Sequence, residues 1–396
     1  MHKYIFLKTI AFNINRLNHL LELFGVTKDE LMFFLNKNNK AKTPILERDV
    51  FTNEIKISNL KKVDELFNKG LNYYLDPKDL WKSKEESIFF RKESFNAKLN
   101  IGAKKIVNRF EEEKISFSTL AKLSDLNVNR IIPVFKINNS PKEVSSEIRK
   151  VLKVDFINNK REYLKSFIKV LADNNILVFE FIERHNTKDK ANIDGFYLSP
   201  NVIVLKRSKY LSREIFTLVH ELGHYLLNKE EIDDNVDNVD YSKLNDIEKW
   251  CNDFAYYFLV GNFVSVIDNL RKASAYNDYN HDIIESISNE THLSTISLYT
   301  RLLYNKKISP NDYSIVKENI LEQIKEWELE NKKKQELENT KAIEEGRTLV
   351  GRSAKEIISP LYKSTLQIGY NEGIISEREF CLKMKIKPEK LDRYLL

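Results

Sequence analysis

Cysteine is almost missing from the chain: its 396 residues include only Cys251 and Cys381, which lie far apart in sequence. A framework of disulfide bonds is therefore excluded, which fits a reducing cytoplasm better than secretion. The N-terminus has a brief apolar run but no secretory signal, and no segment approaches the apolar length of a membrane span. We expect a cytoplasmic protein with no membrane partner.

A strong charge imbalance is also lacking. The 64 Lys and Arg residues oppose 58 Asp and Glu residues, and a net charge of +6 is too weak in a long chain to indicate nucleic acid as a partner. The sequence has no internal repeat long enough to suggest a solenoid. A hydrophobic fraction of 42% suffices for packed cores, and the length predicts two or three domains.

The first 80 residues are expected to be helical. Gly25 can end one helix and Thr27 can cap the next. Two helices joined by a short turn could read DNA, or could form a plain helical hairpin, which we favour. The segment 36–40, where a recognition helix should lie, is rich in asparagine and lysine, and Pro44 follows it. The region is therefore at most a degenerate helix-turn-helix, although DNA stays a possible partner.

Strand character is concentrated in the middle of the chain. Three strands are expected there, at residues 176–182, 195–198 and 202–205. Helical patterns follow from about Ser212 to Leu227 and from about Asp246 to Val260. The predicted fold class is α+β and predominantly helical, with a small three-stranded sheet packed on the first of these helices and helical regions on either side.

The first of these helices contains His220, Glu221 and His224. Residues four apart share a helix face, so the two histidines can hold one metal ion between their ring nitrogens. Glu221 lies beside such an ion, where a general base can take a proton from a zinc-bound water and pass it to a leaving amine. By chance alone, a His-Glu-x-x-His string would occur in roughly one chain in a hundred of this length and composition. The spacing therefore predicts a catalytic zinc site.

Tetrahedral zinc needs a third protein ligand and an open position. No further histidine follows at close spacing, and we favour Glu248, at the start of the next helix, as the third ligand. Asn252, one turn further on, could hydrogen-bond a zinc-bound imidazole. The alternative is a ligand from the acidic loop between the two helices, which contains Asp233, Asp234, Asp237 and Asp240.

These residues carry a family resemblance. The stretch from Phe216 to Leu227, with FTLVHELGH at its start, and the stretch from Glu248 to Ala255 resemble the ImmA/IrrE metallopeptidases, whose patterns are FTLAHELGH and E-x-x-A-N-x-F-A. In the second pattern Cys251 stands in place of alanine, a change between small residues that we expect to leave the metal undisturbed. The resemblance covers residues 140–305 well and implies that Glu248 is the third zinc ligand.

The sequence patterns and the resemblance together suggest a division of the chain. We expect a helical, degenerate helix-turn-helix-like region at 1–80, a helical connector at 81–139, the zinc metallopeptidase domain at 140–305, a charged helical spacer at 306–348 and a small helical C-terminal domain at 349–396.

The resemblance implies a zinc-dependent endopeptidase that cleaves a specific regulatory protein, such as a repressor or an antitoxin, in a phage, mobile-element, stress or defence response. The substrate would pair as an added strand on an open edge of the strand at 201–205. Four side chains are candidates to stabilise the oxyanion, namely Tyr197, His281, His292 and Arg301. The alternative is a regulator that binds DNA or protein and uses the metallopeptidase domain as a sensor, with little proteolysis.

Overall fold

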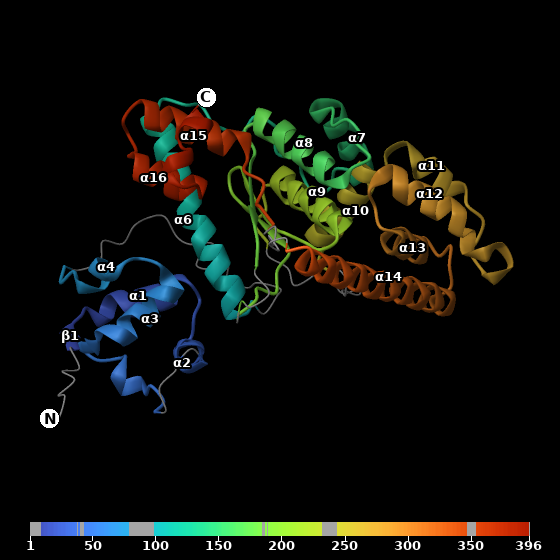
Figure 1. The fold of residues 1–396 in the computed structure, drawn as a ribbon. Helices are drawn as coiled ribbons and strands as arrows, with labels where there is room; N and C mark the ends of the chain where they lie inside the picture. Colours follow the sequence, from blue (N-terminus) through green and yellow to red (C-terminus); the bar gives the residue numbers. More distant parts are fainter. Residues whose placement is uncertain are drawn as a thin grey trace.

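The structure, a computed structural model, describes residues 9–37, 39, 43–78, 99–183, 187, 189–231, 244–346 and 354–395. Helices dominate these residues and surround a small sheet near the middle of the molecule (Figure 1). The prediction of a predominantly helical α+β fold with a three-stranded sheet is confirmed. None of the described helices is both long and apolar enough to cross a membrane.

The N-terminal region has its own core, formed by buried leucines, phenylalanines and valines. Its elements are β1 (Thr9–Ala11), α1 (Ile14–Leu23), α2 (Lys28–Lys37), β2 (Glu54–Lys56), α3 (Ile57–Phe67) and α4 (Leu71–Leu75). The strands β1 and β2 pair in antiparallel fashion, and the helical prediction for this region missed them. Between α1 and α2, Gly25 adopts a positive φ of 55° and Thr27 caps α2 through a reciprocal pair of bonds with Glu30, as the sequence indicated.

The helix α2 contacts the rest of the molecule. Lys104 donates to the carboxylate of Glu30 at 2.8 Å, and Lys37 forms an ion pair with Asp189. Lys104 belongs to the long helix α6 (Ile101–Leu123), and Asp189 precedes the strand β4. The helix α2 is the one that would read DNA in a helix-turn-helix. Its first turn and its last turn both contact other parts of the same chain.

The central region contains the sheet and the helices against it. Its elements are α7 (Pro141–Leu152), α8 (Lys160–Asp173), β3 (Leu177–Phe181), β4 (Gly195–Leu198), β5 (Val202–Lys206), α9 (Leu211–Leu227) and α10 (Asp246–Val260). The remaining helices are α11 (Val264–Asn269), α12 (His281–Thr291), α13 (Thr295–Tyr304), α14 (Pro310–Glu344), α15 (Pro360–Asn371), α16 (Glu377–Met384) and α17 (Asp392–Leu395).

The strand order is β3-β5-β4, with β3 parallel and β4 antiparallel to β5. Because β5 has a partner on each side, the prediction that the strand at 201–205 offers an open edge is wrong. The sequence could not reveal this, since strand order depends on contacts between distant segments. Among the described residues, β4 has no further strand on its outer side, so β4 supplies the free edge near α9.

Both faces of the sheet are buried, and alternate residues of β5 face opposite sides. Ile203 and Leu205 join the core formed with α8, α9 and α10, whereas Val202 and Val204 join a second core formed with α6, α15 and α16. Figure 1 shows these two helical layers on the two sides of the strands. The sheet is therefore the middle layer of the central region.

The second layer joins segments that are far apart in sequence. Phe117 of α6 packs against Tyr362 of α15 at 6.3 Å between ring centroids, and the Lys383 ammonium donates to Ser116 at 2.7 Å. A Cβ at Gly369 would lie 3.1 Å from Cγ of Leu120, so the two helices approach closely there. The five-part division of the chain stays a prediction. The described residues of the connector (81–139) and of the C-terminal region (349–396) pack together on this face of the sheet.

We expect Gly102→Ala to destabilise the protein. A Cβ at this position would lie 2.9 Å from the carbonyl carbon of Lys190 and 3.0 Å from the backbone nitrogen of Ala191, and neither can move freely. Overpacking of this kind costs about 1–3 kcal/mol, which urea unfolding would measure. Ser118→Ala, at an exposed position of the same helix, is the control and should have little effect. Equal stability of the two variants would contradict the close approach.

Candidate metal centre

The helix α9 is buried along its last three turns, between the sheet and α10. Gly223 permits this approach, because a Cβ there would lie 3.1 Å from Sγ and 3.2 Å from Cα of Cys251 on α10. The i and i+4 spacing places His220 and His224 on the side of α9 that faces α10. The first residues of α10 therefore lie beside both rings.

Three side chains converge at this crossing. The Nε2 atoms of His220 and His224 lie 3.1 Å apart. One carboxylate oxygen of Glu248 lies 3.1 Å from Nε2 of His220, and the other lies 3.2 Å from Nε2 of His224. All three side chains are buried, and they form the one His, Cys, Asp and Glu group with metal-ligand spacing that we find among the described residues.

The chemistry of this group fits a divalent metal ion. Two nitrogens and one carboxylate that face a common point match the His₂Glu ligand set of catalytic zinc sites. In the described part of the chain, neither oxygen of Glu248 accepts a regular hydrogen bond. Although burial opposes ionisation, the imidazoles of His224 and His220 hold the pKa of Glu248 well below its ordinary value. A buried negative charge of this kind requires a nearby cation.

Asn252 lies next to Nδ1 of His220, the ring nitrogen that faces away from His224 and Glu248. Its Oδ1 is 3.0 Å from Nδ1 of His220, in position to accept the Nδ1–H. With its proton on Nδ1, the ring of His220 presents an unprotonated Nε2 toward His224 and Glu248. The structure thus brings Asn252 to the place that the sequence analysis assigned to it.

Glu221 is buried beside the group and does not belong to it. Burial raises the pKa of Glu221 to about 7, and the neighbouring His224 and His220 oppose this rise. The absence of a side chain at Gly195 makes room for it, since a Cβ there would lie 3.2 Å from Cγ of Glu221. Glu221 therefore lies between α9 and the free edge strand β4, with a pKa suited to proton transfer near neutral pH.

The four oxyanion candidates have polar partners elsewhere. Tyr197 donates to the carbonyl of Pro200 at 2.8 Å, and the buried His292 lies 2.9 Å from the carbonyl oxygen of Ile157. The partners of the other two are Glu285 for His281, and Asp253 and Tyr257 for Arg301. No contact found among the described residues joins any of the four to His220, His224 or Glu248. The loop aspartates 233, 234, 237 and 240 lie outside the described residues.

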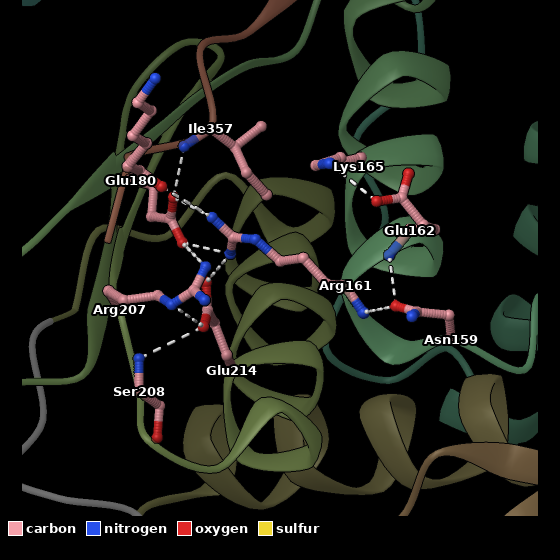
Figure 2. Close-up of polar contacts among 10 residues, drawn as sticks. Asn159, Arg161, Glu162, Lys165, Glu180, Arg207, Ser208, Glu214 and Ile357 are labelled. Carbon is pink, nitrogen blue, oxygen red and sulfur yellow. Dashed lines mark hydrogen bonds and ion pairs between the residues drawn. The ribbon is translucent and has the colours of Figure 1, made fainter. Parts of the chain in front are cut away.

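A buried ion cluster at the start of α9 was not apparent from the sequence. Figure 2 shows Arg161 of α8 reaching toward Glu180 of β3 and Glu214 of α9. Arg161 bonds both oxygens of Glu180, at 2.5 and 2.9 Å, and lies 3.4 Å from Glu214. Arg207 adds a bond to Glu180 at 3.1 Å. Because its members come from three elements and a loop, only the folded chain reveals this cluster, which ties the helix of the site to the sheet.

The same cluster holds a segment from the C-terminal part of the chain. The backbone N–H of Ile357 donates to Glu180, and Arg161 donates to the carbonyl of Lys355 at 3.1 Å. Ile358 also pairs with Phe179 in an antiparallel bridge. Residues 355–358, called the strap here, therefore cover the outer edge of β3, opposite the free edge of β4.

Fold and site together describe a peptidase-type domain, in which a sheet packs on a His-Glu-x-x-His helix and the next helix adds a glutamate. Residues 176–265 match the Peptidase_M78 family model, described as an IrrE N-terminal-like domain, and this match includes His220, Glu221, His224, Glu248 and Asn252. The match confirms the resemblance of this region to ImmA/IrrE proteins. No curated protein and no solved structure is significantly similar to the chain.

Glu214→Gln should reduce the pH dependence of stability. Burial, and then the neighbouring carboxyl group of Glu180, raise the pKa of Glu214 above its ordinary value of 4.5. The folded protein therefore retains a proton that the unfolded chain releases, and the free energy of unfolding falls as the pH rises from the ordinary toward the raised pKa. The loss is at most about 1.4 kcal/mol per pH unit, and glutamine should abolish it.

Urea unfolding between about pH 6 and about pH 9 would measure this difference. Glu162→Gln, at an exposed position of α8, is the control and should keep the slope of the unaltered protein. If Glu214→Gln also kept that slope, Glu214 would be ionised in the folded protein throughout this range.

Proposed function

We propose that the chain is a zinc-dependent endopeptidase in which His220, His224 and Glu248 hold the metal. The observation that carries this proposal is the approach of two imidazole nitrogens and both oxygens of a buried carboxylate to one point, at 3.1 to 3.2 Å. One cation at this point would satisfy all of these atoms at once. The family match supports a peptidase.

The neighbouring residues have separate tasks in this proposal. Zinc, when bound, supplies Lewis-acid chemistry at the scissile carbonyl. Glu221 takes a proton from the attacking water and then delivers it to the leaving amine, and burial, which raises its pKa, favours the protonated form that the second role needs. Asn252 keeps the proton of His220 on Nδ1 and so keeps Nε2 free for the metal.

The free edge of β4 is where we place the substrate backbone. An extended peptide can add to an exposed sheet edge through main-chain hydrogen bonds, while its side chains supply specificity. The contact between Gly195 and Glu221 puts this edge next to the proposed base. Because Gly195–Leu198 are buried in the structure, we propose that the substrate pairs here once this edge is uncovered. We further propose that the substrate is a regulatory protein such as a repressor or an antitoxin in a phage, mobile-element, stress or defence response.

A DNA-binding sensor is the weaker candidate. Glu30 and Lys37, at the two ends of α2, form intramolecular ion pairs with Lys104 and Asp189. A recognition helix must instead present its side chains to a DNA groove. An intact Glu221 also favours hydrolysis, because a purely structural metal site has no use for a base.

Glu221→Gln should keep the metal and abolish cleavage. The amide cannot accept the proton, and loss of a general base costs about 10²- to 10⁴-fold in rate. Quantitative proteomics of new N-termini in the native host, with the unaltered protein against the variant, would reveal the substrate and measure the loss. Glu318→Gln, at an exposed position of α14, is the matched control. Equal cleavage by both variants would exclude the proposed mechanism.

Glu248→Gln should release most of the zinc. The neutral amide removes the negative charge that two buried imidazoles face, and it is a far poorer zinc ligand than a carboxylate. Elemental analysis after dialysis should find one zinc per chain in the unaltered protein and much less in the variant. Asp246→Asn changes an exposed acid in the same first turn and should keep its metal. Full zinc content in Glu248→Gln would point to a different third ligand.

A further inference from the structure

The proposed base belongs to a row of side chains on α9 that faces β4. The row consists of residues four positions apart, namely Arg213, Thr217, Glu221 and Tyr225. Residues at this spacing form a ridge along one side of a helix. A Cβ at Gly195 would lie 2.7 Å from Cγ2 of Thr217 and 3.2 Å from Cγ of Glu221. The start of β4 therefore rests directly on this ridge, beside the base.

Two contacts hold β4 on the ridge, one before and one after the glycine. Before it, Nε of Arg213 donates to Oδ2 of Asp194 at 3.0 Å, and Nη2 of the same guanidinium donates to the same oxygen. After it, the ring of Tyr197 packs edge to face against the ring of Tyr225, at 6.0 Å between the centroids. The spacing between the base and the edge strand is therefore set from both sides.

The ion pair before the glycine is suited to fixing a position. Its side chains are 28% and 16% exposed, and an ion pair that water reaches contributes little to stability. Two N–H groups of one planar guanidinium, however, restrict the orientation of the carboxylate that they share. Asp194 also continues the pairing of β4 with β5, because its carbonyl accepts the N–H of Lys206 at 2.7 Å. A change at Arg213 would therefore act on the backbone of the edge strand.

We propose that Arg213 is a positioning residue that, through Asp194, holds β4 at the distance from Glu221 that hydrolysis requires. The inference rests on the proposed function, in which a substrate backbone pairs with β4 and Glu221 moves the proton. A peptide on this edge takes its position from the strand, so the ion pair sets how the scissile carbonyl meets the attacking water. Misplacement by about 1 Å can cost about 100-fold in rate, which makes a fixed strand important.

Hydrogen exchange tests this role without any assay of peptidase activity. In Arg213→Met, which removes both donors, the backbone amides of residues 195–198 should exchange faster, while those of β3 keep their rates. Arg213→Lys keeps a charged donor and should restore most of the protection. Arg16→Met removes another Arg–Asp pair, formed with Asp76 at 2.8 Å in the N-terminal region, and is the control. Equal exchange at β4 in all four proteins would overturn the proposal.

The kinetic test uses zinc-loaded protein and the substrate that the search for new N-termini identifies. For Arg213→Met we expect kcat to fall about 10- to 100-fold with little change in KM, because the substrate still binds but its reacting atoms are misplaced. The zinc content should stay the same, Arg213→Lys should recover most of the rate, and Arg16→Met should keep all of it. A loss that merely follows the fraction of folded protein, or a rise in KM alone, would refute a positioning role.

The outcomes distinguish this inference from the proposed function. If the unaltered protein generates no N-termini beyond those found with Glu221→Gln, the proposed function fails, and the role of Arg213 in hydrolysis fails with it. If the unaltered protein cleaves a substrate and Arg213→Met cleaves it equally well, the proposed function stands and the role of Arg213 is refuted. A loss confined to kcat, with faster exchange at β4 and recovery by lysine, supports both.

Discussion

The structure depends on one crossing, where α9 and α10 approach so closely that a carboxylate from one faces two imidazoles from the other. A buried charge and two buried rings are costly unless they share a cation. Several otherwise unrelated features serve this crossing. Gly223 removes the side chain that would separate the helices, Gly195 leaves space for Glu221, and the ion cluster around Glu180 attaches the start of α9 to the sheet.

Local sequence patterns were sufficient to predict the elements that carry the site. The bounds of α9 and α10 agree with the prediction to within one residue, because a continuous apolar pattern with helical period marks both. The closeness of His220 and His224 also followed from the sequence, since residues four apart share a helix face. Glu248 was favoured from its place at the start of the next helix, and the family pattern implied the same ligand, but its distance from the histidines depends on how two helices pack.

The features that the sequence did not reveal are non-local. The central place of β5, the β1–β2 pair and the packing of α6 on α15 each depend on segments that the chain brings together only on folding. The ion cluster is a further example: Arg161, Glu180 and Glu214 carry no shared local pattern, and each would ordinarily be read as an exposed charge. His292 illustrates the opposite error, because a histidine that could serve catalysis lies instead against Phe156 and Tyr163.

The helices that pack on the second face of the sheet have a consequence for the protein while it is being synthesised. Helices α15 and α16, near the end of the chain, bury Val202, Val204 and Phe196, and the strap borders β3 just before them. A ribosome makes these segments after the strands that they cover, so this face of the sheet has only α6 against it until α15 and α16 emerge. A product terminated before α15 would therefore leave Val202, Val204 and Phe196 without this cover and expose an apolar surface that favours aggregation.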